Sequence, residues 1–226
     1  MRSVRIAQYA DLAGRAALIV FFTYVMVMNG LGIVGMFHLE GGPNPLELAS
    51  RLASLAFVVL IVGLTIFRLK PVKSAEGLEP RISALLGTGL SIGMSMLPRV
   101  DLDVSLQIVS LVLNLVGWML SAYVLLWLGR AFSVMAQARR LVTSGPYAIV
   151  RHPLYLSEEI AVIGIALNHI SIEAAVVLAV QWLFQLRRMA NEEKVLRAAF
   201  PEYDAYANRT PKVIPRFFPK LKLGHA

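Results

Sequence analysis

The chain has 226 residues, of which 57% are hydrophobic and only 16% are charged, and its mean hydropathy is +0.65. Soluble domains carry roughly a quarter charged residues, so the composition excludes an ordinary soluble domain and indicates a membrane protein. The sequence contains no cysteine, which excludes disulfides, thiolate metal sites and cysteine nucleophiles. The formal net charge of +8 also occurs in nucleic-acid-binding proteins, but its distribution along the chain indicates another origin.

Apolar residues gather in six blocks, and we expect each to form a helix that crosses or enters a bilayer. Gly89 and Gly93 in the third block have the spacing of a close helix-packing motif. The fifth and sixth blocks are short, and we expect them to form a tilted or shallow hairpin. The predicted fold is an all-α, polytopic membrane bundle with about five to six transmembrane helices. The predicted spans are residues 12–37, 48–67, 82–97, 104–128, 153–167 and 174–186.

Basic residues mark one side of this predicted bundle. Of the 22 lysines and arginines, 20 lie before or at the start of the first span, between the second and third, between the fourth and fifth, or after the sixth. The positive-inside rule therefore predicts cytoplasmic termini, and in a bacterium the protein would span the inner membrane. The surplus charge is then topological, and we expect a lipid bilayer and no nucleic acid as partner. The other side carries Arg51 and Arg99 with Glu40, Glu47, Asp101, Asp103 and Glu173.

The first block also invites comparison with a cleaved signal peptide, because it has a basic start. Its apolar stretch is too long, and no small-residue cleavage site follows it. We therefore predict a retained span.

The loop from Leu141 to Tyr155 reads LVTSGPYAIVRHPLY and is the most informative stretch of the chain. Proline is favoured in the first turn of a helix, so Pro153 is expected to begin the fifth span, with His152 at its cap. Free amides and the helix dipole then favour an anionic group there, supported by Arg151. The alternative is that Arg151 and His152 are ordinary interfacial residues.

Glu158 and Glu159 follow Tyr155 by three and four residues, so at least one shares its helical face one turn deeper. A carboxylate at that depth is energetically unfavourable and normally faces a protein interior or a wet cavity. We expect it to attract a cationic cofactor or an amine, or to accept a proton. The alternative is that both carboxylates are solvated at the headgroup level.

A C-terminal tail is the third polar segment on the same side. Glu192 and Glu193 continue the sixth span as a helix that leaves the membrane, and an aromatic segment follows with Tyr203, Tyr206 and Arg209. Alone, the glutamates are typical of a solvated helix face. The aromatic residues, with Phe217 and Phe218, are typical of an interfacial belt.

Taken together, the 141–147 loop, the Arg-His-Pro-Leu-Tyr core at 151–155 and the tail resemble the isoprenylcysteine carboxyl methyltransferase superfamily, which includes phospholipid methyltransferases. The resemblance covers about residues 129–215 in the expected order. It implies an integral membrane enzyme that transfers a methyl group from S-adenosylmethionine to a lipophilic or amphiphilic acceptor. It also implies two regions: transmembrane helices in residues 1–128, and a catalytic region in residues 129–226 whose loop and tail form a cytoplasmic cofactor pocket.

The resemblance further implies roles for individual residues. The cofactor is expected to contact the side chains of Tyr147, His152 and Tyr155, and Glu192 or Glu193 is expected to hold its polar groups. Arg151 and Arg209 are expected to bind carboxylates of cofactor or acceptor. The pair Glu158 and Glu159 is not a feature of the family as a whole, but an amine or hydroxyl acceptor needs a base, and either glutamate is the candidate by its position. The adenine side is expected to be shaped by the backbone near Leu141, Val142 and Gly145.

Two alternatives remain open from the sequence. A membrane sterol or enone reductase would share a related C-terminal architecture and bind NADPH, but the signature regions of that class are not evident. A non-catalytic membrane protein, such as a small transporter, is disfavoured because the spans show no internal repeat. The acceptor is left open among prenylated protein carboxylates, phospholipid amines and small apolar thiols or amines. No metal is expected.

Overall fold

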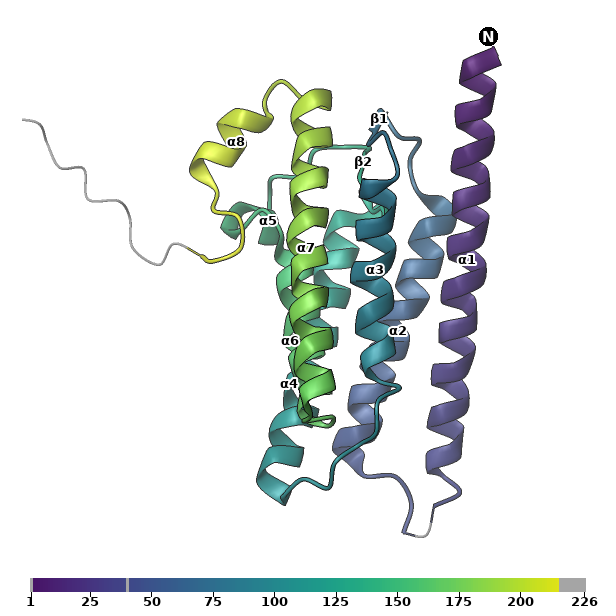
Figure 1. Cartoon of the computed structure of the whole chain (residues 1–226), viewed down its shortest axis with the longest axis vertical. Coiled ribbons are helices and arrows are strands. Elements are labelled where there is room, and N and C mark those ends of the chain that lie inside the picture. Colours follow the sequence, from purple (N-terminus) through teal and green to yellow (C-terminus); the bar gives the residue numbers. More distant parts are fainter. Residues whose placement is uncertain (1, 40, 216–226) are drawn as a thin grey trace, which may run out of the picture.

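A computed structural model describes residues 2–39 and 41–215, with side chains from Asp11 onward, and is mostly helical (Figure 1). Glu40, Arg216, Phe217, Phe218, Lys220 and Lys222, which entered the sequence predictions, lie outside the described residues. The long helices are α1 (Arg2–Met36), α2 (Pro45–Phe67), α3 (Glu79–Met94), α4 (Val104–Leu128), α6 (Pro153–Leu167) and α7 (Ile172–Ala199). The short elements are η1 (Gly129–Ala131), α5 (Pro146–Ile149), α8 (Tyr203–Arg209), β1 (Lys73–Ser74) and β2 (Gln137–Ala138).

Each predicted span coincides with a long helix. The fifth span has the predicted bounds, since α6 begins at Pro153 with His152 as its N-cap. Helix α1 begins earlier than predicted, and α7 continues to Ala199 as the expected exit helix. In the described residues, three helices (α1, α2 and α4) are long and apolar enough to cross a membrane. The number of spans beyond these three stays a prediction.

The prediction of an exclusively helical fold needs a small correction. Strands β1 and β2 pair antiparallel, with Lys73 opposite Ala138 and Ser74 opposite Gln137. Each strand has only two residues, too few to leave a pattern of alternating polarity in the sequence. The pairing joins the α2–α3 connection to the loop after α4, which leads to the predicted site.

The helices pack in two groups. In one group α1 packs on α2, α2 on α4 and α4 on α6, while α3 packs mainly along α7. The N-terminus, both strands, α5 and α8 lie at one end of the bundle, the upper end in Figure 1. We call this end, which carries the predicted site, the loop end, and we call the opposite end the far end.

Helices α4 and α6 pack closely because small residues line their seam. A Cβ atom at Gly117 would overlap the backbone of Ala161, so the two backbones approach more closely than larger residues would allow. Hydroxyl groups add polar contacts across the seam, including Ser121 Oγ to Ser157 Oγ at 3.0 Å and Ser110 Oγ to the Gly164 carbonyl at 2.7 Å. This seam fixes the position of α6 and hence of the helix start at Pro153.

The packing role predicted for Gly89 and Gly93 is wrong. A Cβ atom at either position would meet no atom within 4 Å in the described structure. The close approach in α3 is at Gly87, where a Cβ would lie 2.8 Å from Cδ of Arg188 on α7. Glycine spacing cannot show which face of a helix meets its neighbour, and α3 turns a different face toward α7.

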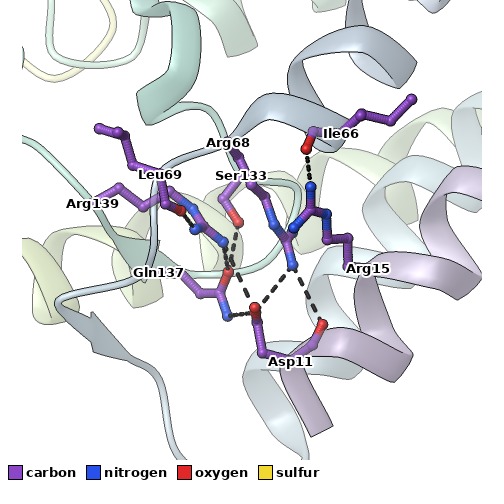
Figure 2. A network of polar contacts seen from close by, with 8 residues as sticks. All are labelled: Asp11, Arg15, Ile66, Arg68, Leu69, Ser133, Gln137 and Arg139. Atoms are coloured by element: carbon purple, nitrogen blue, oxygen red, sulfur yellow. Dashed lines mark hydrogen bonds and ion pairs between the residues drawn. The ribbon is translucent and has the colours of Figure 1, made fainter. Parts of the chain in front are cut away.

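A polar network fastens α1 to the loop that carries β2 (Figure 2). The Asp11 carboxylate accepts hydrogen bonds from Arg68 Nη2 at 3.0 Å and from Gln137 Nε2 at 3.1 Å. Arg139 lies 3.9 Å from the same oxygen and donates to the Leu69 carbonyl. Burial, and then the charge of Arg68, lower the pKa of Arg139 to about 10. One carboxylate thus compensates two buried guanidinium groups beside the predicted site.

Candidate active site

A cavity of about 610 Å³ lies between the two groups of helices and is lined by residues of both. Its middle is apolar, with Phe57, Ile61, Trp118 and Val162 on its walls. Its loop end is polar and contains most of the side chains singled out in the sequence. The predicted site residues that line the cavity are Leu141, Val142, Tyr147, Arg151, His152, Tyr155, Glu158 and Glu192.

The loop, the start of α6 and the tail meet at Arg151 and His152. The backbone amide of Arg151 donates to the Pro211 carbonyl at 2.8 Å, and that of His152 donates to the Lys212 carbonyl at 3.1 Å. Arg151 Nη1 also donates to the Ala207 carbonyl at 2.8 Å. These bonds hold α8 and the segment after it against the N-terminal end of α6. The tail, which is distant in sequence, therefore forms one wall with the loop and the start of α6.

Glu193 binds this junction from α7. Its Oε1 lies 3.0 Å from His152 Nε2 and 3.1 Å from Arg151 Nη2. Burial alone would raise the pKa of Glu193, but the hydrogen bond from His152 and the charge of Arg151 outweigh it, so the pKa lies below its usual value. Glu193 is therefore ionised near neutral pH and engaged with protein groups.

Glu192, its neighbour, instead lines the cavity. Its Oε2 accepts a hydrogen bond from the Tyr155 hydroxyl at 3.0 Å. The Tyr155 ring lies between two polar groups, with the His152 ring 5.4 Å away and the Arg188 guanidinium 5.0 Å from its centre. Of the two adjacent glutamates, Glu192 is thus the one available to a ligand.

The Gly-Pro-Tyr turn depends on its glycine. Gly145 has a φ of +58°, and a Cβ there would overlap the Trp127 ring, so both conformation and space require glycine. Tyr147 is buried in the following turn, and its carbonyl accepts from the Tyr206 hydroxyl at 2.7 Å. Burial, then nearby Glu192, raise the pKa of Tyr147, and burial raises that of Tyr206 to about 12. Both phenols therefore keep their protons at neutral pH.

Four predicted site residues lie outside the cavity wall, and one of them is Glu193, whose contacts with Arg151 and His152 are given above. Gly145 shapes the backbone turn that precedes Tyr147. Glu159 is buried, and its Oε1 accepts a hydrogen bond from Gln181 Nε2 at 2.7 Å. Arg209 ends α8 with an exposed side chain. Their assignment to binding or catalysis stays a prediction.

Arg188 is the main lining residue that the sequence reasoning missed. It is buried and lines the cavity, and it donates to Gln185 Oε1 at 2.7 Å. Its position after the sixth span made it resemble a topological arginine. The signal that distinguishes it is periodicity, since Gln181, Gln185, Arg188 and Glu192 recur at the spacing of one helical face.

Several buried donors at the loop end have no hydrogen-bond partner in the described part of the chain. Those on residues that line the cavity are Arg139 Nε, Arg151 Nε, Arg188 Nε and the Tyr203 hydroxyl. Buried polar groups are normally hydrogen-bonded, so these donors fit a ligand with acceptor groups. Across the described part of the chain, no group of three or more His, Asp or Glu residues is placed to hold a metal ion.

Residues 109–198 match the isoprenylcysteine carboxyl methyltransferase (ICMT) family. An Arabidopsis thaliana protein-S-isoprenylcysteine O-methyltransferase B is 32% identical over 112 residues, which cover 46% of this chain and 57% of the plant protein. The resemblance inferred from the motifs is thus confirmed for this part of the chain.

Two bacterial relatives have higher identity over shorter segments. The nickel-cobalt-cadmium resistance protein NccN of Alcaligenes xylosoxydans xylosoxydans is 39% identical over 88 residues, 38% of this chain and 39% of that protein. The cobalt-zinc-cadmium resistance protein CzcN of Cupriavidus metallidurans is 40% identical over 84 residues, 37% of each chain. The matches therefore span less than two thirds of the length of each of these relatives.

Proposed function

We propose that this chain, whose residues 109–198 match the ICMT family, is an integral membrane methyltransferase that uses S-adenosylmethionine and a lipophilic or amphiphilic acceptor. The observation that carries the proposal is the cavity, which joins a polar loop end to an apolar middle within one bundle. Such a shape accommodates a polar cofactor beside a greasy acceptor. The names of the bacterial relatives state resistance to metals and not a reaction, so the proposal rests on the family match and the cavity.

The side chains at the loop end fit the polar groups of this cofactor. Glu192 is placed to bind its ammonium group or ribose hydroxyls, and the unpartnered Nε atoms of Arg151 and Arg188 suit its carboxylate. Glu193 has a different role, because it is bonded to His152 and Arg151 and orients both. When bound, S-adenosylmethionine supplies a methyl group on a sulfonium.

Methyl transfer of this kind depends mainly on alignment and on exclusion of water. The packed α4–α6 seam and the tail bound to Arg151 provide a rigid wall for alignment. A carboxylate acceptor is already ionised, whereas an amine or hydroxyl acceptor must lose a proton. Glu158 is the cavity-lining carboxylate of α6 and is our candidate base for such an acceptor.

We further propose that the loop end faces the cytoplasm and that the acceptor enters from the bilayer. The basic residues predicted to be cytoplasmic include Arg68, Arg130 and Arg139. Arg68 directly follows α2, Arg130 lies in η1 after α4 and Arg139 directly follows β2, and these elements end or lie at the loop end. Phospholipid amines and prenylcysteine carboxylates are both acceptors of suitable shape.

The test is calorimetry of the purified protein with S-adenosylmethionine, S-adenosylhomocysteine and NADPH. We expect the two adenosyl ligands to bind, and we expect His152→Ala to abolish S-adenosylhomocysteine binding while the protein stays folded. Glu192→Gln should weaken it by roughly tenfold, the equivalent of one charge-assisted hydrogen bond. The control is His38→Ala, because His38 is exposed and outside the cavity. Binding of NADPH in place of the adenosyl ligands would favour the reductase alternative and contradict the proposal.

A further inference from the structure

The far end of the cavity, opposite the loop end, is also polar. It is lined by Asn29 of α1, Asn114 of α4, and Asn168 and His169 directly after α6. His169 is only 3% exposed. Polar side chains inside a membrane-spanning bundle are energetically unfavourable and commonly mark a functional pathway or site. These four residues, from α1, α4 and the segment directly after α6, therefore need an explanation that the loop-end site does not give.

The three asparagines use their amide nitrogens for hydrogen bonds to protein groups. Asn114 Nδ2 donates to the Ser110 carbonyl at 2.9 Å, and Asn29 Nδ2 donates to Ser54 Oγ at 3.2 Å. Asn168 Nδ2 donates to Ser110 Oγ and also lies 3.4 Å from the Gly164 carbonyl. Because carbonyl oxygens only accept, the amide orientations of Asn114 and Asn168 are fixed with Nδ2 toward the helix. Within the described residues, the amide oxygens of Asn114 and Asn168 accept no side-chain hydrogen bond and are available as acceptors.

His169 follows the same pattern. Its Nδ1 lies 2.8 Å from the Ile165 carbonyl, so Nδ1 carries the proton and Nε2 is an acceptor in the neutral ring. Nε2 is buried and has no hydrogen-bond partner among residues 11–39 and 41–215. Asn114, Asn168 and His169 thus each bond a protein group through a nitrogen that donates and have an acceptor atom left over. This part of the cavity suits a ligand group that donates hydrogen bonds.

Charge narrows the chemistry of that ligand group. Arg51 and Arg99 line the same end of the cavity, and Glu47 is bound to Arg51 at 3.0 Å. The remaining charge is therefore positive, which disfavours a cationic ammonium. A neutral donor such as a hydroxyl fits both the acceptors and the charge.

We propose that the end of the cavity at Asn114, Asn168 and His169 is a second polar subsite, which binds a hydroxyl at the end of an elongated amphiphile remote from the loop. Ten residues of helical chain separate Glu158 from Asn168, which is about 15 Å. The apolar middle of the cavity fits the hydrocarbon between the two polar ends. The inference rests on the proposed function in one respect, since it makes this amphiphile the methyl acceptor.

The test compares two probes in lipid nanodiscs. One is dodecylamine, and the other is the amino alcohol with the same chain and a hydroxyl on its far carbon. Binding is measured by the shift in unfolding temperature over a concentration series. We expect the amino alcohol to bind about fivefold more tightly, the equivalent of one net hydrogen bond. His169→Phe should abolish this difference, and His169→Gln, which keeps an acceptor, should retain part of it.

Controls separate the subsite from the fold and from the proposed reaction. His38→Phe changes an exposed histidine outside the cavity and should leave the difference intact. Asn29→Val provides a second test on α1 should His169→Phe not fold. Equal affinity of the two probes in the wild type, or a difference that survives both substitutions, overturns the subsite. S-adenosylhomocysteine binding is measured in parallel, and its absence in the wild type contradicts the proposed function whatever the probes show.

Discussion

Glu158 and Glu159 are adjacent on α6 but have different surroundings. Glu158 lines the cavity, whereas Glu159 is buried against Gln181 of α7. The sequence alone gave both the same candidate role, because helical spacing places either of them near the face of Tyr155. Only the packing of α6 against α7 separates a carboxylate that meets a ligand from one that binds a neighbouring amide.

We predict that the natural acceptor is neutral or amine-bearing and not a free carboxylate of the prenylcysteine type. A carboxylate at Glu158 attracts an ammonium group and repels an acceptor carboxylate, and the repulsion grows as the site loses water. Glu158→Gln should lower methyl transfer to an amine by roughly a hundredfold if it acts as the base. Glu159→Gln is the matched control and should keep the preference for amines.

The measurement is methyl transfer from radiolabelled cofactor to phosphatidylethanolamine-like amines and to farnesylcysteine analogues. Efficient methylation of farnesylcysteine by the wild type, undiminished in both variants, would refute the prediction. It would also leave Glu158 without a role in choosing the acceptor.

At the scale of elements, the sequence predicted where helices begin better than which faces meet. Pro153 begins α6 as expected, since proline fits the first helical turn. The packing glycines were misplaced, because a pair such as Gly89 and Gly93 carries no information on the neighbouring helix. The spacing of Arg188 with Gln185 and Glu192 indicates one helical face, but the sequence does not show that α7 turns this face toward α3 and α6, so its place in the cavity was missed.

The α4–α6 seam gives a prediction on stability. Gly117→Val adds atoms where even a Cβ overlaps the Ala161 backbone, so we expect a loss of about 3 kcal/mol in the free energy of unfolding. Gly93→Val is the control, because it adds the same side chain to a helix at a position where no atom of the described structure lies within 4 Å of the new Cβ. It should change stability by less than about 1 kcal/mol. Denaturant unfolding in detergent measures both, and equal losses would show that the seam is not tightly packed.

The connection of α1 to the β2 loop gives a second prediction at this scale (Figure 2). Asp11→Ala leaves the buried Arg68 and Arg139 guanidinium groups without their shared carboxylate. Removal of one partner of a buried pair costs about 3–5 kcal/mol, and the partial exposure of Asp11 reduces this to about 2 kcal/mol. Asp204→Ala breaks an exposed ion pair with Arg197 and should cost below about 1 kcal/mol. Similar midpoints of thermal unfolding for the two variants would contradict this assignment.

At the scale of the whole molecule, the position of the cavity explains why the predicted spans differ in hydropathy. Helices α1, α2 and α4 are long and apolar, whereas α3, α6 and α7 are shorter in their apolar parts or carry charges. Residues of α6 and α7 such as Glu158, Arg188 and Glu192 face the cavity and not the lipid. A hydropathy pattern averages over all faces of a helix, and therefore it weakens where one face lines a polar site.

The distribution of basic residues between the two ends of the bundle predicts the orientation of the whole chain in the membrane. Because the sequence has no cysteine, single cysteines can be introduced at Ser3, Ser144 and Lys220 and treated with an impermeant thiol reagent in intact cells and in inverted vesicles. The positive-inside rule predicts labelling of all three from the cytoplasmic side only. Asp101→Cys is the opposite control, because Asp101 lies in the α3–α4 connection at the far end and should be labelled from outside. Labelling of Ser144→Cys from outside would place the loop end on the wrong side for a cytoplasmic cofactor, and the proposed reaction would then fail together with the topology.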